Sequence, residues 1–396
     1  MRKLRVLVTD ADTPKSLAIV RALGATHEIW TAASSRLALA AWSRYTRRHL
    51  QYRLDDDLGF CDWVYEAGRA NQIDIVIPPE ESSALLLSRE AARFLQSGIT
   101  IASLPIDALE KVVDKTKTIE AARRIGTRIP DTQIPERNDA VLDAAHRVGY
   151  PVVLKPRSTC FFDGSRFISS IAVGYASSDE QVRSWLRRMD SRMPPPIVQE
   201  FVPGEGIGVC MLLGAAGEVL AEFAHRRLRD YRPTGSGSVL RESIVLPPRL
   251  RDESARLLGH LGCRGVAMVE FRVNPDTGQA YLMEVNGRFW GSLQLAIDAG
   301  VNFPALLLAS LTGRPVQKPS YKHGVVLRWW AGDFIRTLRV LKGPPPGFAG
   351  SFPSRFSAVL DFIGPQPSGT RNEILRRTDC WPSLIEPISM MRRLIA

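Results

Sequence analysis

Two glutamates in the second half of the chain have the spacing of a metal site. Glu270 and Glu284 lie in strand-like runs on either side of Asn274-Pro-Asp-Thr-Gly278, a sequence typical of a turn. A hairpin centred on Thr277 places the two carboxylates directly opposite each other, where like charges are destabilising. A hard divalent cation would compensate this repulsion, and Asn286 faces the same side two residues farther on. The spacing therefore predicts a metal site formed by Glu270, Glu284 and Asn286.

The alternative is a solvated pair of glutamates at a sheet edge, since surface charges of like sign do occur in proteins. The flanking residues argue against it. Residues 266–269 and 282–283 are apolar, so both carboxylates would stand in a half-buried sheet, where an uncompensated charge is costly.

Two lysines upstream could contact phosphate. Lys155 ends the strand-like run Pro151–Lys155 behind Val153 and Leu154, and a lysine buried there needs an anionic partner such as a nucleotide phosphate. Lys115 lies in a predicted helix that runs from Asp107 to near Gly126. Taken alone, Lys115 is better explained as a solvated helix lysine.

A basic segment from His225 to Glu242 contains candidates for binding a substrate carboxylate. Arg227, Arg229 and Arg241 could form a clamp, and the glycines at 235 and 237 could let the loop close over an intermediate. Each arginine could equally be a solvated surface residue. His225 is better explained as a structural histidine than as a base.

The order of the predicted elements indicates a Rossmann-like N-terminal domain. Short strands at 4–9, 28–32, 74–78 and 99–102 alternate with helices, one of them capped by Thr13 with Pro14 at its first position and another over 82–96. No G-x-G-x-x-G follows the first strand, so an NAD dehydrogenase is disfavoured. An α+β region follows, and we place boundaries at 1–110, 111–318 and 319–396, with a small nucleotide-covering subdomain over about 115–197.

The composition limits the classes of partner and the compartment that the protein is expected to have. No apolar run of the 396 residues approaches the roughly 20 needed to cross a bilayer, so cytoplasm is the expected compartment. The net charge of +11 favours anionic partners such as nucleotides and metabolites, but no motif supports binding of nucleic acid. The five scattered cysteines form no C-x-x-C pair, which predicts reduced and mostly buried thiols.

The segment Met283-Glu-Val-Asn-Gly-Arg-Phe-Trp-Gly-Ser292, followed by Ala299-Gly-Val-Asn-Phe-Pro304, resembles the metal-binding end of ATP-grasp carboxylate–amine ligases. The likeness is to bacterial proteins similar to the large subunit of carbamoyl phosphate synthase. It implies an ATP-grasp fold of two α+β subdomains after the Rossmann-like domain. It also implies that Glu270, Glu284 and Asn286 hold one or two Mg²⁺ (or Mn²⁺), while Arg288 steadies the transferring phosphoryl group.

The same resemblance assigns the nucleotide contacts. It implies that Lys115 and Lys155 meet the phosphates of ATP and that the backbone of Glu200, Phe201 and Val202 meets the adenine edge. Glu205 would take the ribose hydroxyls. The phosphate-covering loop of such enzymes is rich in glycine, whereas residues 157–165 contain only Gly164, so we assign no phosphate contact there.

These expectations lead to an ATP-dependent ligase that activates a small-molecule carboxylate as an acyl phosphate, joins it to an amine, and releases ADP and phosphate. One alternative is an ATP-grasp kinase that phosphorylates a small molecule without ligation. Another is a basic nucleotide-binding protein that contacts a membrane surface through residues 322–342. There, a predicted amphipathic helix over 325–341 carries Trp329 and Trp330, although packing on the enzyme core explains such a helix as well.

Overall fold

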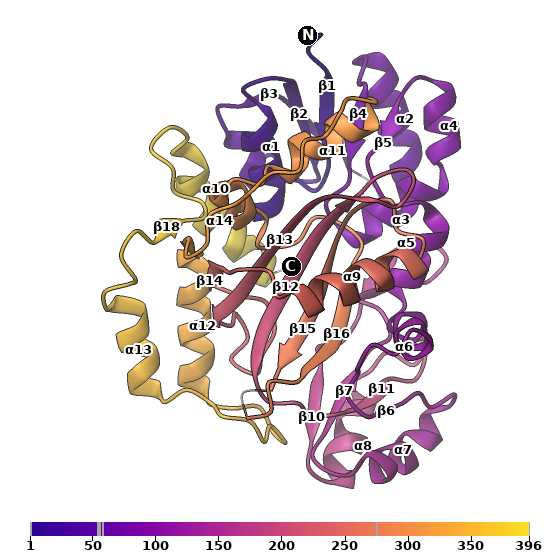
Figure 1. Ribbon diagram of the computed structural model, residues 1–396, viewed down its shortest axis with the longest axis vertical. Helices are drawn as coiled ribbons and strands as arrows, with labels where there is room; N and C mark the ends of the chain where they lie inside the picture. Colours follow the sequence, from indigo (N-terminus) through magenta and orange to yellow (C-terminus); the bar gives the residue numbers. More distant parts are fainter. Residues whose placement is uncertain (1, 54–56, 58, 275, 396) are drawn as a thin grey trace.

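The computed structural model describes residues 2–53, 57, 59–274 and 276–395. Pro275, in the predicted hairpin turn, lies outside the described residues. The described strands form sheets of five, four, seven and two strands, and the larger three follow one another along the chain (Figure 1). The cleft that contains the site lies where these sheets approach one another.

The N-terminal sheet is parallel, as the alternation of strands and helices predicts, with strand order β3-β2-β1-β4-β5. Its strands are β1 (Arg5–Val8), β2 (Glu28–Ala33), β3 (Thr46–Gln51), β4 (Ile75–Ile77) and β5 (Thr100–Ile101). Its helical elements are α1 (Pro14–Leu23), η1 (Leu39–Trp42), α2 (Gly59–Ala70), α3 (Glu81–Arg89) and α4 (Ala91–Gln96). Thr13 caps α1, because its side chain accepts a hydrogen bond from the Ser16 amide.

Two predicted helices are interrupted in the structure. The helix expected over 82–96 breaks at Glu90 into α3 and α4. The helix expected from Asp107 to Gly126 breaks at Asp114 into α5 (Ile106–Val113) and α6 (Lys115–Arg124). Asp114 is extended and its carboxylate accepts from the Thr116 amide, so a new N-cap forms inside the predicted helix. Lys115 is therefore the first residue of a helix.

A small antiparallel sheet follows, with strand order β10-β7-β11-β6 and helices on one side (Figure 1). It contains β6 (Thr132–Gln133), β7 (Val152–Lys155), β10 (Gly174–Ala176), β11 (Ile197–Glu200), η2 (Asn138–Ala140), α7 (Val141–Val148) and α8 (Asp179–Arg187). The predicted strand over 166–173 is shorter, because β8 (Cys160–Phe162) turns back on β9 (Phe167–Ser169) as a separate hairpin.

The large sheet, with order β16-β15-β12-β13-β14-β17-β18, supplies most of the cleft. Its strands are β12 (Glu205–Leu213), β13 (Val219–Arg229), β14 (Leu240–Ser243), β15 (Gly265–Val273), β16 (Ala280–Asn286), β17 (Val326–Arg328) and β18 (Arg371–Asn372). Val209 and Met211 of β12 pack in the cluster that includes α9 (Pro248–His260), whereas Cys210 and Leu212 pack on the opposite face. This alternation is what a strand buried on both faces requires.

The C-terminal residues complete the large sheet and add a helical edge. The helices are α10 (Leu293–Ala299), α11 (Phe303–Leu311), α12 (Trp330–Lys342), α13 (Arg355–Ile363) and α14 (Trp381–Ile395). The predicted helix over 325–341 is wrong at its start, because residues 326–328 form β17 between β14 and β18. Its remainder is α12, which lies beside α13 at one edge of the molecule (Figure 1).

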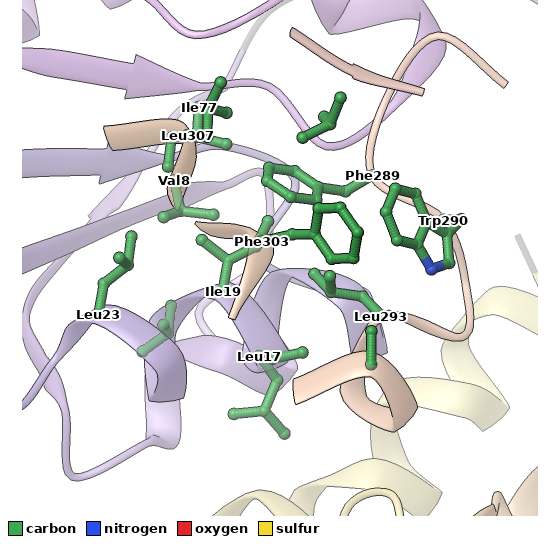
Figure 2. Packing of buried hydrophobic residues seen from close by; sticks show 14 of the residues in the cluster. Val8, Leu17, Ile19, Leu23, Ile77, Phe289, Trp290, Leu293, Phe303 and Leu307 are labelled. Atoms are coloured by element: carbon green, nitrogen blue, oxygen red, sulfur yellow. The ribbon is translucent and has the colours of Figure 1, made fainter. Parts of the chain in front are cut away.

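The N-terminal domain is joined to the large sheet by a continuous apolar core. Phe289, Trp290 and Phe303 meet Leu17, Ile19 and Val8 (Figure 2), and all six are at most 1% exposed. The rings of Trp290 and Phe303 contact edge to face, with centroids 5.0 Å apart. This packing fixes α1 against the loop that follows β16, so residues of both parts reach the same cavity.

Among the described helices, no single one is long and apolar enough to cross a membrane. Of these helices, only α10 and α11 taken together have the necessary length and apolar composition, and this pair is bent by 91°. All five cysteines are free thiols, three of them buried and Cys380 exposed.

Candidate active site

The predicted pairing of Glu270 with Glu284 is confirmed. They are directly opposed in the antiparallel pair β15–β16, and Met268 faces Asn286 in the same register. Nearer the turn the register shifts by one residue, so that Phe271 pairs with Leu282. A bulge at this point restores the predicted register where the carboxylates stand. Both glutamates line a cleft between the large and small sheets.

The structure supplies positive partners to both carboxylates. Arg227 of β13 donates from its guanidinium to Glu270 and also lies 3.7 Å from Asp230. Burial alone would raise the pKa of Glu284, but Lys115, the Asn286 amide, Arg227 and Lys155 outweigh it and hold this pKa below its ordinary value. The Asn286 amide nitrogen lies 3.2 Å from the Glu284 carboxylate. Glu284 is therefore an ionised, half-buried carboxylate at neutral pH.

The donor set fits a hard divalent cation. Within the described residues, no group of three or more His, Cys, Asp and Glu side chains could hold a metal ion. The candidate set is two carboxylates and one carboxamide, so its oxygen ligands are those that Mg²⁺ prefers, and such sites usually complete their shell with water and phosphate. The contact between Glu270 and Arg227 indicates that this position already takes a positive partner.

The two predicted phosphate lysines lie in the same cleft as the glutamates. Lys155 ends β7, and its ammonium donates to the Gln199 side chain across 2.5 Å. Burial lowers the pKa of Lys155, Glu284 opposes this change, and Lys115 and Arg272 add to it, which together bring the pKa to about 8. Lys115 begins α6, where its amide donates to the Arg157 carbonyl at 2.8 Å. A cluster of half-buried cations beside one carboxylate is suited to a polyanion.

The hinge residues Glu200, Phe201 and Val202 also line this cleft, as the resemblance implies for the adenine contact. A cluster of aromatic rings packs against the Phe201 side chain of this hinge. The ring of Phe348, in the loop between α12 and α13, lies 5.6 Å from that of Phe201 and 4.9 Å from that of Tyr175. The C-terminal region therefore packs directly on the hinge.

Five predicted site residues do not line the cleft: Asn286, which contacts Glu284 beside it, Arg241 and Arg288, which line the adjoining cavity, and Glu205 and Arg229. Gly206 lines the cleft, so the preceding residue of β12, Glu205, faces away and lies 3.8 Å from Arg226. The assignment of Glu205 to ribose is therefore not supported by its position. Arg229 donates to Asp333 of α12 across 2.5 Å and is buried against that helix, so its position is structural.

A second cavity of about 610 Å³ adjoins the cleft and shares Arg227, Gly237 and Glu270 with it. It lies between the start of α1, the loop 231–238, β14 and the segment after β16. The predicted residues Arg227, Arg241 and Arg288 line it. Arg241 is buried in an ion pair with Glu373, whereas no ion pair is found for Arg288 among the described residues. This cavity therefore contains an arginine without an ion-pair partner among the described residues.

His225 also lines the second cavity and is a neutral, buried histidine. Burial, then Arg227 and Arg241, lower its pKa to about 3. One ring nitrogen lies 3.2 Å from the Ser292 hydroxyl, and the other, Nδ1, has no hydrogen-bond partner. An imidazole in this state can orient a substrate by a hydrogen bond but is a poor base at neutral pH.

Several residues of the site were not found from the sequence. Lys15, in the first turn of α1, lies in the second cavity beside Glu80 at 2.9 Å, and burial lowers its pKa to about 8. Arg272 ties the hinge to the loop through the carbonyls of Gly204 and Gly235. The capped start of α1 was a usable signal for Lys15, since helix N-termini attract anions. No local signal identifies Phe348, because its contacts are long range.

Comparison with known proteins gives the same fold. Residues 192–332 match a family described as ATP-grasp in the biosynthetic pathway with Ter operon. The arginine-specific large chain of mitochondrial carbamoyl phosphate synthase from Neurospora crassa is 22% identical over 243 residues. This match covers 59% of the present chain and 20% of the relative, so the chain spans about a fifth of that relative's length.

Several solved structures are similar in fold to this protein over most of its length. The N5-carboxyaminoimidazole synthetase of Staphylococcus aureus, complexed with ADP, is 12% identical with a TM-score of 0.65 over 82% of each chain. The biotin carboxylase domain of Hydrogenobacter thermophilus 2-oxoglutarate carboxylase, in complex with MgADP and bicarbonate, is 14% identical with a TM-score of 0.65, over 82% of this chain and 74% of that one. At these identities the likeness is one of fold. Together with the family match over residues 192–332 and the opposed glutamates of β15 and β16, it shows that the chain has an ATP-grasp fold.

Proposed function

We propose that this protein is an ATP- and Mg²⁺-dependent ligase that activates an organic carboxylate as an acyl phosphate and joins it to an amine. One observation carries the proposal. The cleft that suits a nucleotide and the cavity that suits an anionic substrate share the wall formed by Arg227, Gly237 and Glu270. A phosphoryl group at this wall can be reached from both sides.

The cleft supplies the contacts that a nucleotide needs. The hinge residues 200–202 offer backbone groups for the base, and Lys115 and Lys155 offer ammonium groups for phosphates. Glu270, Glu284 and Asn286 would hold Mg²⁺, which neutralises phosphate charge during transfer. Tyr175 donates to the Thr234 carbonyl at 3.0 Å, so the loop 231–238 is held over the cleft and helps to exclude water.

The second cavity suits an acid with an organic body. Its volume of about 610 Å³ lies in the range of small-molecule sites. Bicarbonate, which the 2-oxoglutarate carboxylase domain binds, would leave most of this space empty. Tyr231, Trp329 and Met268 give the cavity apolar walls, and Arg288 gives it a cation for the carboxylate. We therefore expect a substrate acid larger than bicarbonate.

The chemistry balances in two steps. A carboxylate oxygen attacks the γ-phosphorus of ATP, the bond between that phosphorus and the bridging oxygen breaks, and ADP leaves. Arg288 and Lys155 stabilise the charge on the transferring group. The amine nitrogen then attacks the carbonyl carbon of the acyl phosphate. Phosphate leaves and the nitrogen loses a proton, which gives the amide.

A screen for ADP release tests the proposal, with amino acids, peptides and small carboxylic acids offered alone and in pairs. Ligation predicts ADP release that requires an acid and produces a hydroxamate when hydroxylamine replaces the amine. ADP release that depends on an alcohol and gives no hydroxamate would instead identify a kinase. Failure of the protein to bind MgADP in calorimetry would refute the nucleotide site itself. The Lys117→Met variant, altered on an exposed part of α6, serves as the control.

A further inference from the structure

The hairpin of α12 and α13 presents a broad apolar face to solvent. On α12, Trp330, Phe334, Leu338 and Leu341 recur at intervals of three or four residues and are 40–53% exposed. The opposite face of the same helix is buried on the core. The exposed residues therefore form a single stripe along the helix.

The neighbouring helix extends this stripe into a surface. Phe356, Val359, Leu360 and Ile363 of α13 are 37–75% exposed. Phe362 joins the two helices, because its ring lies 5.2 Å from that of Trp330 and 5.7 Å from that of Phe334. Figure 1 shows the two helices side by side at the edge of the molecule. Contiguous apolar surfaces of this kind mark interaction sites.

Two exposed cations stand where the hairpin joins its helices. Lys342 ends α12 and Arg355 begins α13, and neither forms an ion pair within the described residues.

The carboxylates of the same region are neutralised. Over residues 330–391, each acidic side chain is buried or paired with an arginine. They are Asp333, Asp361, Glu373, Asp379 and Glu386. The exposed face is therefore apolar with a cationic rim.

We propose that the outer face of the α12–α13 hairpin docks on the surface of an anionic lipid bilayer. Tryptophan, phenylalanine and leucine are the residues that enter the boundary between headgroups and acyl chains, and flanking cations bind anionic headgroups. A second copy of the chain fits less well. A twofold contact brings the same face against itself, so Lys342 and Arg355 would meet like charges, while Asp361, whose side chain is 43% exposed, already pairs with Arg229 and Arg336.

Flotation of the full chain with vesicles tests this proposal. The protein is expected to float with vesicles of phosphatidylcholine mixed with phosphatidylglycerol and not with phosphatidylcholine alone, and added salt should weaken the binding. Replacing both tip cations, Lys342→Gln with Arg355→Gln, should lower the partition coefficient roughly 30-fold, since each cation near an anionic surface contributes about 1 kcal/mol. The control is Arg147→Gln, an exposed arginine of α7.

The apolar contribution is tested by Phe356→Ser with Ile363→Ser, whose side chains are 75% and 69% exposed and not needed for folding. This variant should lose vesicle binding while it retains MgADP affinity. The matched control is Leu95→Ser on α4, which is 65% exposed elsewhere on the molecule. Absence of flotation with anionic vesicles overturns the proposal. The proposal is also overturned if light scattering shows that the protein is a dimer and that the Phe356→Ser, Ile363→Ser variant is a monomer.

Discussion

The Lys155→Met variant should make the protein more stable and abolish nucleotide binding. Lys155 is buried among Lys115 and Arg272, and its pKa is lowered from 10.5 to about 8. Methionine has a similar length and no charge, and the sulfur of Met283 already lies 3.9 Å from the lysine nitrogen. The substitution therefore removes a charge that the fold accommodates at a cost and leaves the packing largely intact.

The size of the effect follows from this pKa. The difference between 10.5 and about 8 corresponds to about 3 kcal/mol lost by holding the ammonium ionised at neutral pH. The attraction to Glu284 is already contained in this pKa, whereas loss of the hydrogen bond to Gln199 should offset about 1 kcal/mol of the gain. We expect Lys155→Met to raise the free energy of unfolding by about 2 kcal/mol at neutral pH, without nucleotide.

The change of wild-type stability with pH provides a second test of whether the ionised Lys155 is destabilising. Between about pH 8 and 10.5 the unfolded lysine keeps its proton while the folded one loses it, so the wild-type protein gains stability as the pH rises. The advantage of the variant should shrink across this window. Urea unfolding of both proteins at several pH values measures it, with Lys117→Met as the control. A variant that is less stable at neutral pH, or whose advantage does not change with pH, would refute the reasoning.

Three further variants separate the roles of neighbouring residues. Glu284→Gln should lower turnover roughly 10²–10³-fold and reduce the stability of the metal-free protein, and normal turnover would contradict its place in the metal site. Arg229→Met should leave turnover unchanged. It should lower the free energy of unfolding, measured by urea titration, by about 2 kcal/mol, because buried Asp333 loses one of its partners. Loss of turnover in a folded Arg229→Met protein would instead show that Arg229 has a catalytic role. Phe348→Ala should raise KM for ATP about fivefold with little change in kcat, because the Phe348 ring packs on Phe201 of the hinge. An unchanged KM would show that this packing does not position the hinge.

The core of the site could be predicted from the sequence because a hairpin is local. The turn at 274–278 sets the register, and the period of two residues along each strand then determines which side chains share a face. A register centred on Thr277 predicts the opposition of Glu270 and Glu284; the structure has this pairing, with a bulge between Glu270 and Phe271 that offsets the shifted register nearer the turn. Lys155, at the end of an apolar strand, could be placed by similar reasoning about burial.

The rest depended on contacts between distant segments. Arg227 reaches Glu270 only because β13 and β15 both pair with β12, and Phe348 reaches the hinge from a loop almost 150 residues away. The predictions for Glu205 and Arg229 show the same limit. Glu205 lies beside Arg226 and not in the lining of the cleft, and Arg229 meets α12, whose position no local pattern defines. The helix break at Asp114 was missed because one N-cap outweighed the helical pattern around it.

The charges of the cleft compensate one another within the protein. Glu270 is held by Arg227 and Glu284 by Lys115 and Lys155, so both candidate metal-binding carboxylates have partners of opposite sign within the chain. Uncompensated, any one of these buried charges would be costly. Arg227 lines both cavities, so an arginine released from Glu270 remains within the second cavity. It would then be available to a substrate carboxylate, which would couple occupation of the metal site to binding of the acid.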